Sequence, residues 1–243
     1  FKLSVMAKKI KLKFISTPFD FDSANFLSKI VDYYKISSGD NNFNNLIKMV
    51  LSKKKPTMIS TGILNLKEID NLIKLIKQKI NKKKFCLLHC VSAYPVKLNE
   101  ANLFVLDYLK QKRINFGYSD HTIGGLSAIV ASIKGAQVIE KHFTLDNNFS
   151  SFRDHQISLN PINMKKLVND IRDVEKLCIN KYKKYSKDEK KNVHSMRRSI
   201  YANQSIQRGQ IINENNIKIV RPFVEIQPND INKILGKKAK KNI

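Results

Sequence analysis

The sequence is poor in cysteine, in acidic residues and in long apolar runs, and each shortage excludes a class of protein. Three cysteines, Cys86, Cys90 and Cys178, are too few for a disulfide framework, and none has the spacing of a zinc site. No apolar run approaches the ~20 residues of a membrane-spanning helix. Residues 1–5 lack the basic start and apolar centre of a signal peptide. We therefore expect a cytoplasmic protein without a membrane anchor, whose cysteines in the apolar stretch 85–91 are buried as small hydrophobes.

Acidic residues number 20 against 45 lysines and arginines, which gives a formal net charge of +25. Such an excess can indicate nucleic-acid binding. The lysines are dispersed, however, as in 53–55, 82–84 and 181–191, and no recognised nucleic-acid motif accompanies them. The sequence therefore favours a solvated lysine-rich surface and no nucleic-acid partner. The same surplus would attract anionic substrates.

Apolar, β-branched runs alternate with amphipathic stretches over the first 178 residues. The runs predict strands near 11–16, 33–37, 57–60, 85–91, 114–118 and 137–142. Helical spacing predicts helices near 22–31, 43–53, 66–80, 100–111, 124–134 and 161–178. Regular alternation indicates an α/β protein with a parallel sheet, and the lack of a dinucleotide-binding glycine motif favours a barrel over an open sheet. Because a (β/α)8 TIM barrel has eight strands, we expect an incomplete barrel whose N-terminal strands precede residue 1.

The pattern changes after Cys178. Residues 180–196 include a charged, apolar-poor stretch and predict a linker between a barrel domain at 1–179 and a second domain at 197–243. The second domain is expected to be small and β-rich, with a strand at 197–202, a turn at Gly209 and a short helix at 213–216. Its few core residues suggest that it, too, is cut short.

Polar side chains gather where the predicted strands meet the loops that follow them. In a β/α barrel, these carboxyl ends of the strands carry the active site. The positions are 16–20, 35–40, 60–62, 89–95, 119–121 and 140–142. Small hydroxyl groups, backbone N–H groups and helix N-termini can bind a phosphate or carboxylate there, and Lys35 can add a positive charge. Any one cluster is also explained as a turn or an N-cap, but their recurrence at one end of the sheet favours an anion site.

Two histidines, His121 and His142, each close an apolar run, and one helical segment separates them. Consecutive strands joined by a helix are parallel neighbours, so both imidazoles should project from the same end of the sheet. A lone strand-end histidine is more often a packed or capping residue, but two on adjacent strands favour a metal site open to water and substrate. His89 lies inside a predicted strand and is interpreted as structural. His155 and His194 are assigned no role.

Several ordered motifs resemble those of the sialic acid (N-acetylneuraminate) synthase family. In the barrel they are Phe14-Ile15-Ser16-Thr17-Pro18-Phe19-Asp20, Tyr34-Lys35-Ile36 with Ser38-Gly39-Asp40, Ile59-Ser60-Thr61-Gly62, Leu87-Leu88-His89-Cys90-Val91-Ser92 with Tyr94-Pro95, Gly117-Tyr118-Ser119-Asp120-His121-Thr122 and Ile139-Glu140-Lys141-His142-Phe143-Thr144-Leu145-Asp146. In the second domain, Arg197-Arg198-Ser199 through Arg221-Pro222 and Leu235-Gly236-Lys237 resemble the antifreeze-like SAF domain at the C-terminus of that family.

The resemblance implies a transferase that condenses phosphoenolpyruvate with an N-acyl amino sugar to give a nine-carbon 2-keto acid and phosphate. The metal ligands would be His121 and His142, holding Mn²⁺ or Mg²⁺ that polarises the sugar aldehyde. The catalytic candidates are Lys35, Asp40, Tyr94 and Asp154. The candidates for substrate binding are Thr17, Phe19, Lys35, Ser38, Ser60, Ser92, Ser119 and Arg221. Arg221 matches an arginine that the SAF domain offers to the partner's active site in a domain-swapped homodimer.

The sequence departs from the family pattern at several places. A glutamate motif on the family's first strand and a lysine on the next would both precede Phe1. Asp40 stands where many members have glutamate, Ser92 stands where some have asparagine, and the glycine that commonly follows Arg221-Pro222-Phe223-Val224 is absent. We expect the 243 residues by themselves to be inactive or unstable, because an open barrel exposes strand edges.

Three alternatives remain at this stage. A sister synthase would make legionaminic or pseudaminic acid from a different amino sugar, and Ser38-Gly39-Asp40 looks closer to the sialic and legionaminic type. A metal-dependent phosphosugar aldolase or isomerase would use the same anion and metal groups but would not explain the SAF-like domain. A basic nucleic-acid-binding protein would bind nucleic acid with an affinity that is lost at high salt and is unaffected by His121→Ala.

Overall fold

The computed structural model describes residues 1–79, 84–151, 154–179 and 182–243 and divides the chain into two compact units, Phe1–Ile179 and Asn180–Ile243. In the first unit, strands and helices alternate in the order α1 (Lys2–Lys9), β1 (Ile15–Ser16), α2 (Phe21–Leu27), β2 (Tyr33–Ile36), α3 (Asn44–Ser52), β3 (Thr57–Ser60), α4 (Leu66–Lys77), β4 (Phe85–His89), α5 (Val105–Gln111), β5 (Phe116–Asp120), α6 (Leu126–Ile133), β6 (Ile139–Lys141) and α7 (Pro161–Leu177). Short 3-10 turns at Ser38–Asp40 and Leu98–Glu100 follow β2 and β4.

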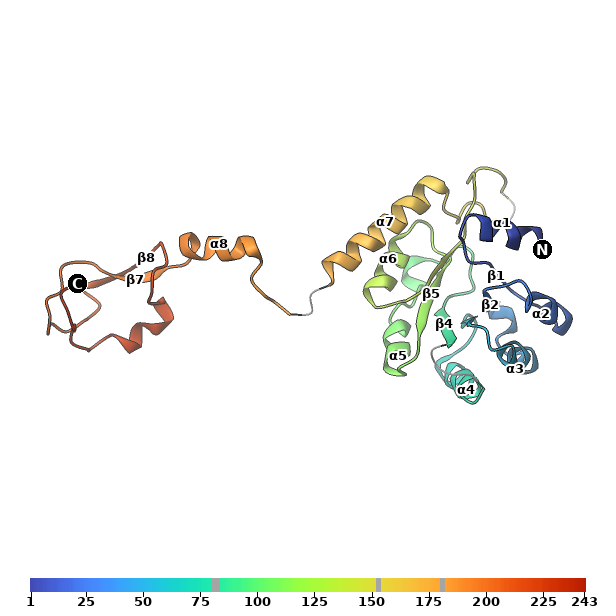
Figure 1. Cartoon of the computed structure of the whole chain (residues 1–243), viewed down its shortest axis with the longest axis horizontal. Helices are drawn as coiled ribbons and strands as arrows, with labels where there is room; N and C mark the ends of the chain where they lie inside the picture. The colour runs from blue at the N-terminus through green and yellow to red at the C-terminus, as the bar shows by residue number, and fades with distance from the viewer. Residues whose placement is uncertain (80–83, 152–153, 180–181) are drawn as a thin grey trace. The chain divides into compact units, whose positions relative to one another are not determined.

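The six strands form one parallel sheet in sequence order, which is the half-barrel arrangement predicted from the alternation. Helices α2, α3, α4 and α5 follow one another around the strands (Figure 1). The register pairs Ile36 with Ile59, Ile59 with Leu87 and Leu87 with Phe116. Because all neighbours are parallel, the loops that leave β2 to β6 emerge at one edge of the sheet.

The main core lies between the sheet and the helices. Alternate strand residues, such as Ile36, Ile59 and Leu87, are fully buried against apolar side chains of α2 to α5, including Leu46 and Leu106. Period-2 burial on the strands and period-3.6 burial on the helices produce this layer. The opposite strand face carries Leu88 and Cys90 and leads towards the polar residues at the strand ends.

Side-chain caps begin three of the helices that follow the strands, α2, α4 and α7. Asp20 caps α2 by accepting a hydrogen bond from the Ser23 backbone N–H at 2.6 Å. Asn65 and Glu68 form a reciprocal capping box at the start of α4. Asn160 caps α7, with Pro161 in its first turn. These caps fix where the loops before α2, α4 and α7 end.

Some element boundaries differ from the sequence-based ones. The first strand, predicted over 11–16, is only two residues long, and the helix predicted at 100–111 is a 3-10 turn followed by α5. The predicted end of α4 at residue 80 lies outside the described residues. Residues 187–196, expected within a linker, form helix α8 (Lys187–Met196), because Ser186 and Glu189 make a capping box at its start.

The second unit contains the antiparallel pair β7 (Ser199–Ala202) and β8 (Ile217–Val220) and a 3-10 helix at Pro228–Lys233. Gly209 adopts a φ of 86°, which allows its N–H to reach the carbonyl of Ala239 at 2.8 Å. Ile206 and Ala239 are buried. The short helix predicted at 213–216 is a turn instead, in which the Asn216 side chain accepts from the Asn213 N–H and donates to the Ile211 carbonyl.

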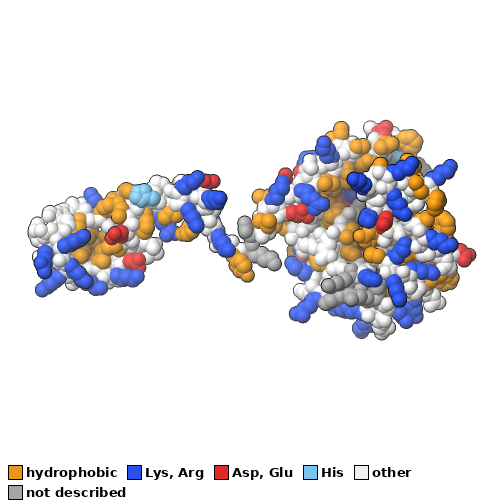
Figure 2. Space-filling model, in the orientation of Figure 1, with side chains coloured by type: hydrophobic (Ala, Val, Ile, Leu, Met, Phe, Trp, Pro, Cys, Tyr) orange, Lys and Arg blue, Asp and Glu red, His pale blue; other side chains and the backbone are white. Residues whose placement is uncertain are grey.

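Lysine and arginine side chains are scattered over the visible surface of each unit rather than gathered in one patch, as their spacing in the sequence predicts (Figure 2). No helix within the described ranges combines the length and apolarity that crossing a bilayer requires.

Candidate active site

A cavity of about 360 Å³ lies at the carboxyl ends of β2 to β6. Eight of the residues predicted from the sequence line it, together with Glu140: Lys35, Ser38, Ser60, Ser92, Tyr94, Ser119, His121 and His142. They come from five strands, so the parallel register alone brings them together. This is the position that the sequence pattern predicts for an active site in a β/α barrel.

One wall of the cavity consists of small polar groups. The hydroxyls of Ser60 and Ser92 are buried, and neither has a hydrogen-bond partner within the described part of the chain. Gly62 donates its N–H to the Ser38 hydroxyl at 3.2 Å, and a Cβ on Gly62 would lie only 2.2 Å from the Ser92 hydroxyl. Because buried polar groups are normally hydrogen-bonded, two orphaned hydroxyls beside a glycine indicate a place for a ligand rich in acceptors.

Lys35 and Glu140 form the charged pair of the cavity. The Lys35 ammonium lies 3.1 Å from the Glu140 carboxylate, and the Lys35 side chain is only 12% exposed. Ser119 also donates its hydroxyl to Glu140, at 2.6 Å. Glu140 lies at a predicted strand end but is not among the site residues predicted from the sequence. Its position two residues before His142, which directly follows β6, was the available signal, because residues i and i+2 of extended chain share a face.

The two predicted metal ligands lie side by side. The ring centroids of His121 and His142 are 5.3 Å apart, and the Tyr94 ring lies 4.4 Å and 6.1 Å from them. His121 Nδ1 is 2.9 Å from the Val91 carbonyl, so it can donate there and leave Nε2 for another partner. His142 Nδ1 lies 3.5 Å from the Asp154 carboxylate.

The protonation of His142 and Tyr94 is set mainly by burial. Burial lowers the pKa of His142, and the opposing pull of Asp154 is smaller. Burial also raises the pKa of Tyr94, so its hydroxyl stays protonated. A neutral imidazole is the form that binds a metal. In the described residues, however, no group of three or more His, Cys, Asp or Glu side chains is arranged to hold a metal ion.

The other predicted site residues lie outside the cavity lining. Asp154 is not part of the lining, and its carboxylate lies 3.5 Å from Nδ1 of the lining residue His142. Asp40 accepts a hydrogen bond from Ser37 at 2.5 Å, Thr17 is half-buried after β1, and Phe19 is 66% exposed. Arg221 belongs to the second unit, where its Nε donates to the Met196 carbonyl at 2.6 Å. Within the first unit, the structure therefore groups most of the anion-binding and metal-binding candidates and leaves Thr17, Phe19, Asp40 and Asp154 outside the lining.

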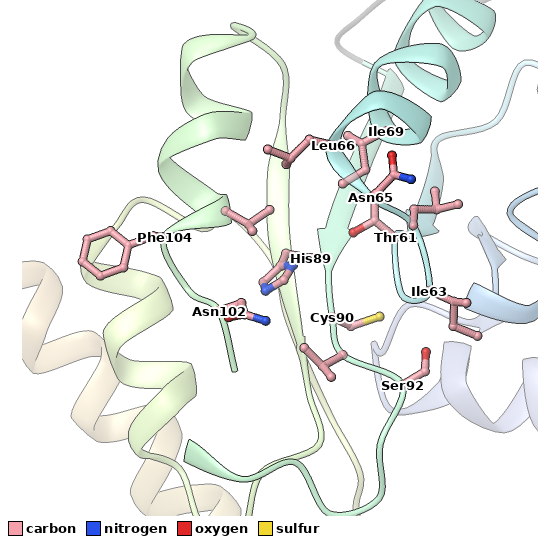
Figure 3. A pocket seen from close by; sticks show the side chains of 13 residues that line it. Thr61, Ile63, Asn65, Leu66, Ile69, His89, Cys90, Ser92, Asn102 and Phe104 are labelled. Atoms are coloured by element: carbon pink, nitrogen blue, oxygen red, sulfur yellow. The ribbon is translucent and has the colours of Figure 1, made fainter. Parts of the chain in front are cut away.

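A larger cavity of about 650 Å³ lies beside the first, between the loops that lead into α4 and α5 (Figure 3). It shares Ile63, Cys90 and Ser92 with the smaller one, and its lining is mostly apolar. His89 belongs to this cavity, bonded through Nε2 to the Ala101 carbonyl at 2.9 Å and stacked on Tyr118. Burial lowers the pKa of His89, which agrees with the structural role expected from its place in the strand. Among the described residues, no carboxylate, lysine or arginine lines this cavity, whereas Lys35 and Glu140 line the smaller one.

Comparisons with known proteins agree with this geometry. The model of the NeuB family matches residues 1–183, and that of the SAF domain matches residues 197–243. The chain is 38% identical to an N,N'-diacetyllegionaminic acid synthase of Campylobacter jejuni, over 99% of this chain and 73% of that protein. It is 37% identical to a pseudaminic acid synthase of the same species, over 94% of this chain and 66% of that protein. The crystal structure of an N-acetylneuraminic acid synthetase from Leptospira borgpetersenii superposes with a TM-score of 0.73 at 32% identity, covering 79% of this chain and 67% of that one.

Proposed function

Because this chain belongs to the NeuB family, we propose that it is a transferase that condenses phosphoenolpyruvate with an N-acyl amino sugar, giving a nonulosonic acid and phosphate. The observation that carries the proposal is the orphaned pair of buried hydroxyls, Ser60 and Ser92, in the same small cavity that the histidine pair lines. An anionic co-substrate and an aldehyde would meet there. The family match and the SAF domain favour this function over an aldolase, an isomerase or a nucleic-acid-binding protein.

Phosphoenolpyruvate would bind against the polar wall. Ser38, Ser60 and Ser92 would donate hydroxyls to its phosphate or carboxylate oxygens, and Lys35 would supply positive charge. Ser119 already donates to Glu140, so it would act by orienting that carboxylate. Thr17 and Phe19 stay predictions for this substrate, since neither lines the cavity.

The histidine side of the cavity fits a divalent metal. Nε2 of His121 is available, burial keeps His142 neutral, and Asp154 holds the other nitrogen of His142. Two protein ligands leave coordination positions open for water and substrate. We propose Mn²⁺ rather than Mg²⁺, because Mg²⁺ binds oxygen ligands in rigid octahedral sites. When bound, the metal would act as a Lewis acid that polarises the aldehyde oxygen of the open-chain sugar.

The reaction forms one carbon–carbon bond and releases one phosphate. Carbon 3 of phosphoenolpyruvate attacks the aldehyde carbon, and the aldehyde oxygen takes up a proton. Water adds to the cationic carbon 2 and loses a proton, and phosphate leaves from the tetrahedral intermediate. Glu140, held by Lys35 and Ser119, is the carboxylate placed to accept the proton of that water. Tyr94, Asp40 and Asp154 are proposed to contact the amino sugar.

We further propose a homodimer in which Arg221 of one SAF domain contributes to the active site of the partner. The support is the resemblance to the family, the match of residues 197–243 to the SAF domain and the exposure of Arg221 at the end of β8. The proposed setting is the cytoplasm, where phosphoenolpyruvate is available.

The test measures phosphate release by the full-length protein with phosphoenolpyruvate and a panel of amino sugars. The panel comprises N-acetylmannosamine and the diacetamido sugars that lead to legionaminic and pseudaminic acid, because relatives of both of these types match the chain. Release should require both substrates, stop with a chelator and return with Mn²⁺. His121→Ala should abolish it. Release from phosphoenolpyruvate alone, or release that chelation leaves unchanged, would contradict the proposal.

A further inference from the structure

A buried ion pair lies directly behind the two histidines. Asp120 is the last residue of β5 and Lys141 the last residue of β6, so each immediately precedes one of the proposed ligands, His121 and His142. The Lys141 ammonium is 2.9 Å from Asp120 Oδ2, and the two side chains are 2% and 0% exposed. It is the most buried ion pair among the described residues.

The pair belongs to a network that holds the backbone on both sides of His121. Asp120 Oδ1 accepts hydrogen bonds from the N–H and the hydroxyl of Thr122, both at 2.8 Å, and from the Tyr118 hydroxyl at 3.3 Å. Lys141 donates a second hydrogen bond to the Thr122 carbonyl. The residues before and after His121 are therefore both tied to the residue before His142.

Such a pair is not explained by stability alone. Removing two charges from water carries a large desolvation penalty, and well-packed apolar residues in their place often stabilise a folded protein equally well or better. The other lysine–carboxylate pairs of this unit are more exposed, as in Lys134 with Asp107, whose side chains are 19% and 44% exposed. A buried pair with defined hydrogen bonds instead fixes the relative position of the two segments that carry it, because the attraction between the two charges is lost when they move apart.

We propose that the Asp120–Lys141 pair is a positioning clamp that sets the separation of the His121 and His142 imidazoles and thereby the affinity of the site for a divalent metal. The inference rests on the proposed metal-binding function. The neighbouring contacts support it: the rings are 5.3 Å apart, and His121 is fixed independently by its Nδ1 contact with Val91. Without the clamp, the end of β6 can shift relative to β5, and the two ligands no longer meet one ion.

The experiment compares Lys141→Gln with the matched control Lys134→Gln, which breaks an ion pair away from the cavity. Mn²⁺ binding is measured without substrates from the electron paramagnetic resonance signal of free Mn²⁺, and phosphoenolpyruvate binding by calorimetry. Lys141→Gln should weaken Mn²⁺ binding by about tenfold or more. Its phosphoenolpyruvate affinity should stay within about twofold, because Ser60, Ser92 and Gly62 lie on β3, β4 and their loops; general damage to the fold would lower both affinities. Lys134→Gln should leave both unchanged.

A second variant guards against loss of folding. The Asp120→Asn, Lys141→Gln double variant leaves no uncompensated charge in the core and should show the same selective loss of Mn²⁺ affinity. Unchanged Mn²⁺ affinity in a folded variant overturns the clamp, as does failure of both variants to fold, which makes the pair a requirement of folding. A separate measurement tests the premise. If the single variant His121→Ala, with the clamp intact, binds Mn²⁺ as tightly as the unsubstituted protein does, the proposed metal site itself is wrong.

Discussion

At the scale of single residues, the absence of a side chain at Gly62 shapes the cavity as much as any functional group. A Cβ at this position would lie 2.2 Å from the Ser92 hydroxyl and 2.6 Å from the Ser38 hydroxyl. The two hydroxyls can converge there only because the residue between them is glycine. We expect the same convergence to accommodate the anionic end of phosphoenolpyruvate.

Gly62→Ala should therefore weaken phosphoenolpyruvate binding selectively. The added methyl group displaces the serine hydroxyls, so we expect the KM for phosphoenolpyruvate to rise about tenfold or more, which corresponds to about 1.4 kcal/mol of lost binding. Steady-state kinetics with varied phosphoenolpyruvate measure this. Gly39→Ala is the matched control, because its Cβ would meet nothing closer than the Ser37 hydroxyl at 3.8 Å. Equal KM values in the two variants would show that the convergence at Gly62 does not bind the substrate.

The residues that sequence reasoning selected share one property, which is a place at the end of a strand. Lys35, Ser60 and His121 could be chosen because strand ends in a parallel sheet meet at one edge. Glu140 was not selected, since its importance depends on the contacts with Lys35 and Ser119 from neighbouring strands. Asp40 was selected by resemblance, and the structure instead shows it bonded to Ser37. Pairing across strands is a property of the fold that a single sequence does not display.

At the scale of elements, the Asn41 side chain attaches the turn after β2 to the end of β3. Asn41 is buried and donates its amide N–H groups to the carbonyls of Ser60 at 3.2 Å and Gly62 at 2.9 Å. Both carbonyls belong to the segment that carries the polar wall of the cavity. Asn41 thus connects two strand-to-helix loops and holds the wall in place.

Asn41→Ala should destabilise the protein and loosen the polar wall. Two buried carbonyls lose their donors, which costs about 1–3 kcal/mol for each unsatisfied group. We expect a lower midpoint of urea unfolding and a higher KM for phosphoenolpyruvate, whereas Mn²⁺ affinity should change little because the histidines directly follow β5 and β6. The neighbouring exposed residue offers a control, and Asn42→Ala should match the unsubstituted protein in all three measurements. A loss of stability with an unchanged KM would mean that Asn41 supports the fold alone.

Element type was easier to predict than element length. Apolar runs in the sequence identified all six strands of the sheet, and the reason is clearest for β4 and β5, whose residues are all buried. The first strand proved to be two residues long, since only Ile15 and Ser16 pair with β2. Helix α8 was missed because its sequence is charged on every side, and the capping box of Ser186 and Glu189 was the available signal. The polarity of residues 187–196 therefore predicted a linker, whereas the capping box at their start favours the helix that they form.

At the scale of the whole molecule, the two units carry different parts of the proposed site. The first unit contains the polar wall and the histidines, and the second contains Arg221 at the end of β8. The loss of apolar residues predicts a domain boundary near residue 180, and the structure divides the chain into Phe1–Ile179 and Asn180–Ile243. Which copy of the first unit receives Arg221 depends on assembly, and a single sequence does not encode this in any local pattern.

Mixing two inactive variants tests the proposed exchange between subunits. Arg221→Ala removes the contributed arginine, and His121→Ala removes a proposed metal ligand. Each homodimer should be nearly inactive. If the SAF domain serves the partner, a mixed dimer has one site with an intact barrel and an intact Arg221. Random reassortment of equal amounts makes half of the dimers mixed, with one of two sites working, so about one quarter of the unsubstituted activity should return. Phosphate release after co-expression measures this. If Arg221 serves its own barrel instead, each barrel of the mixed dimer lacks one essential group, and no activity returns.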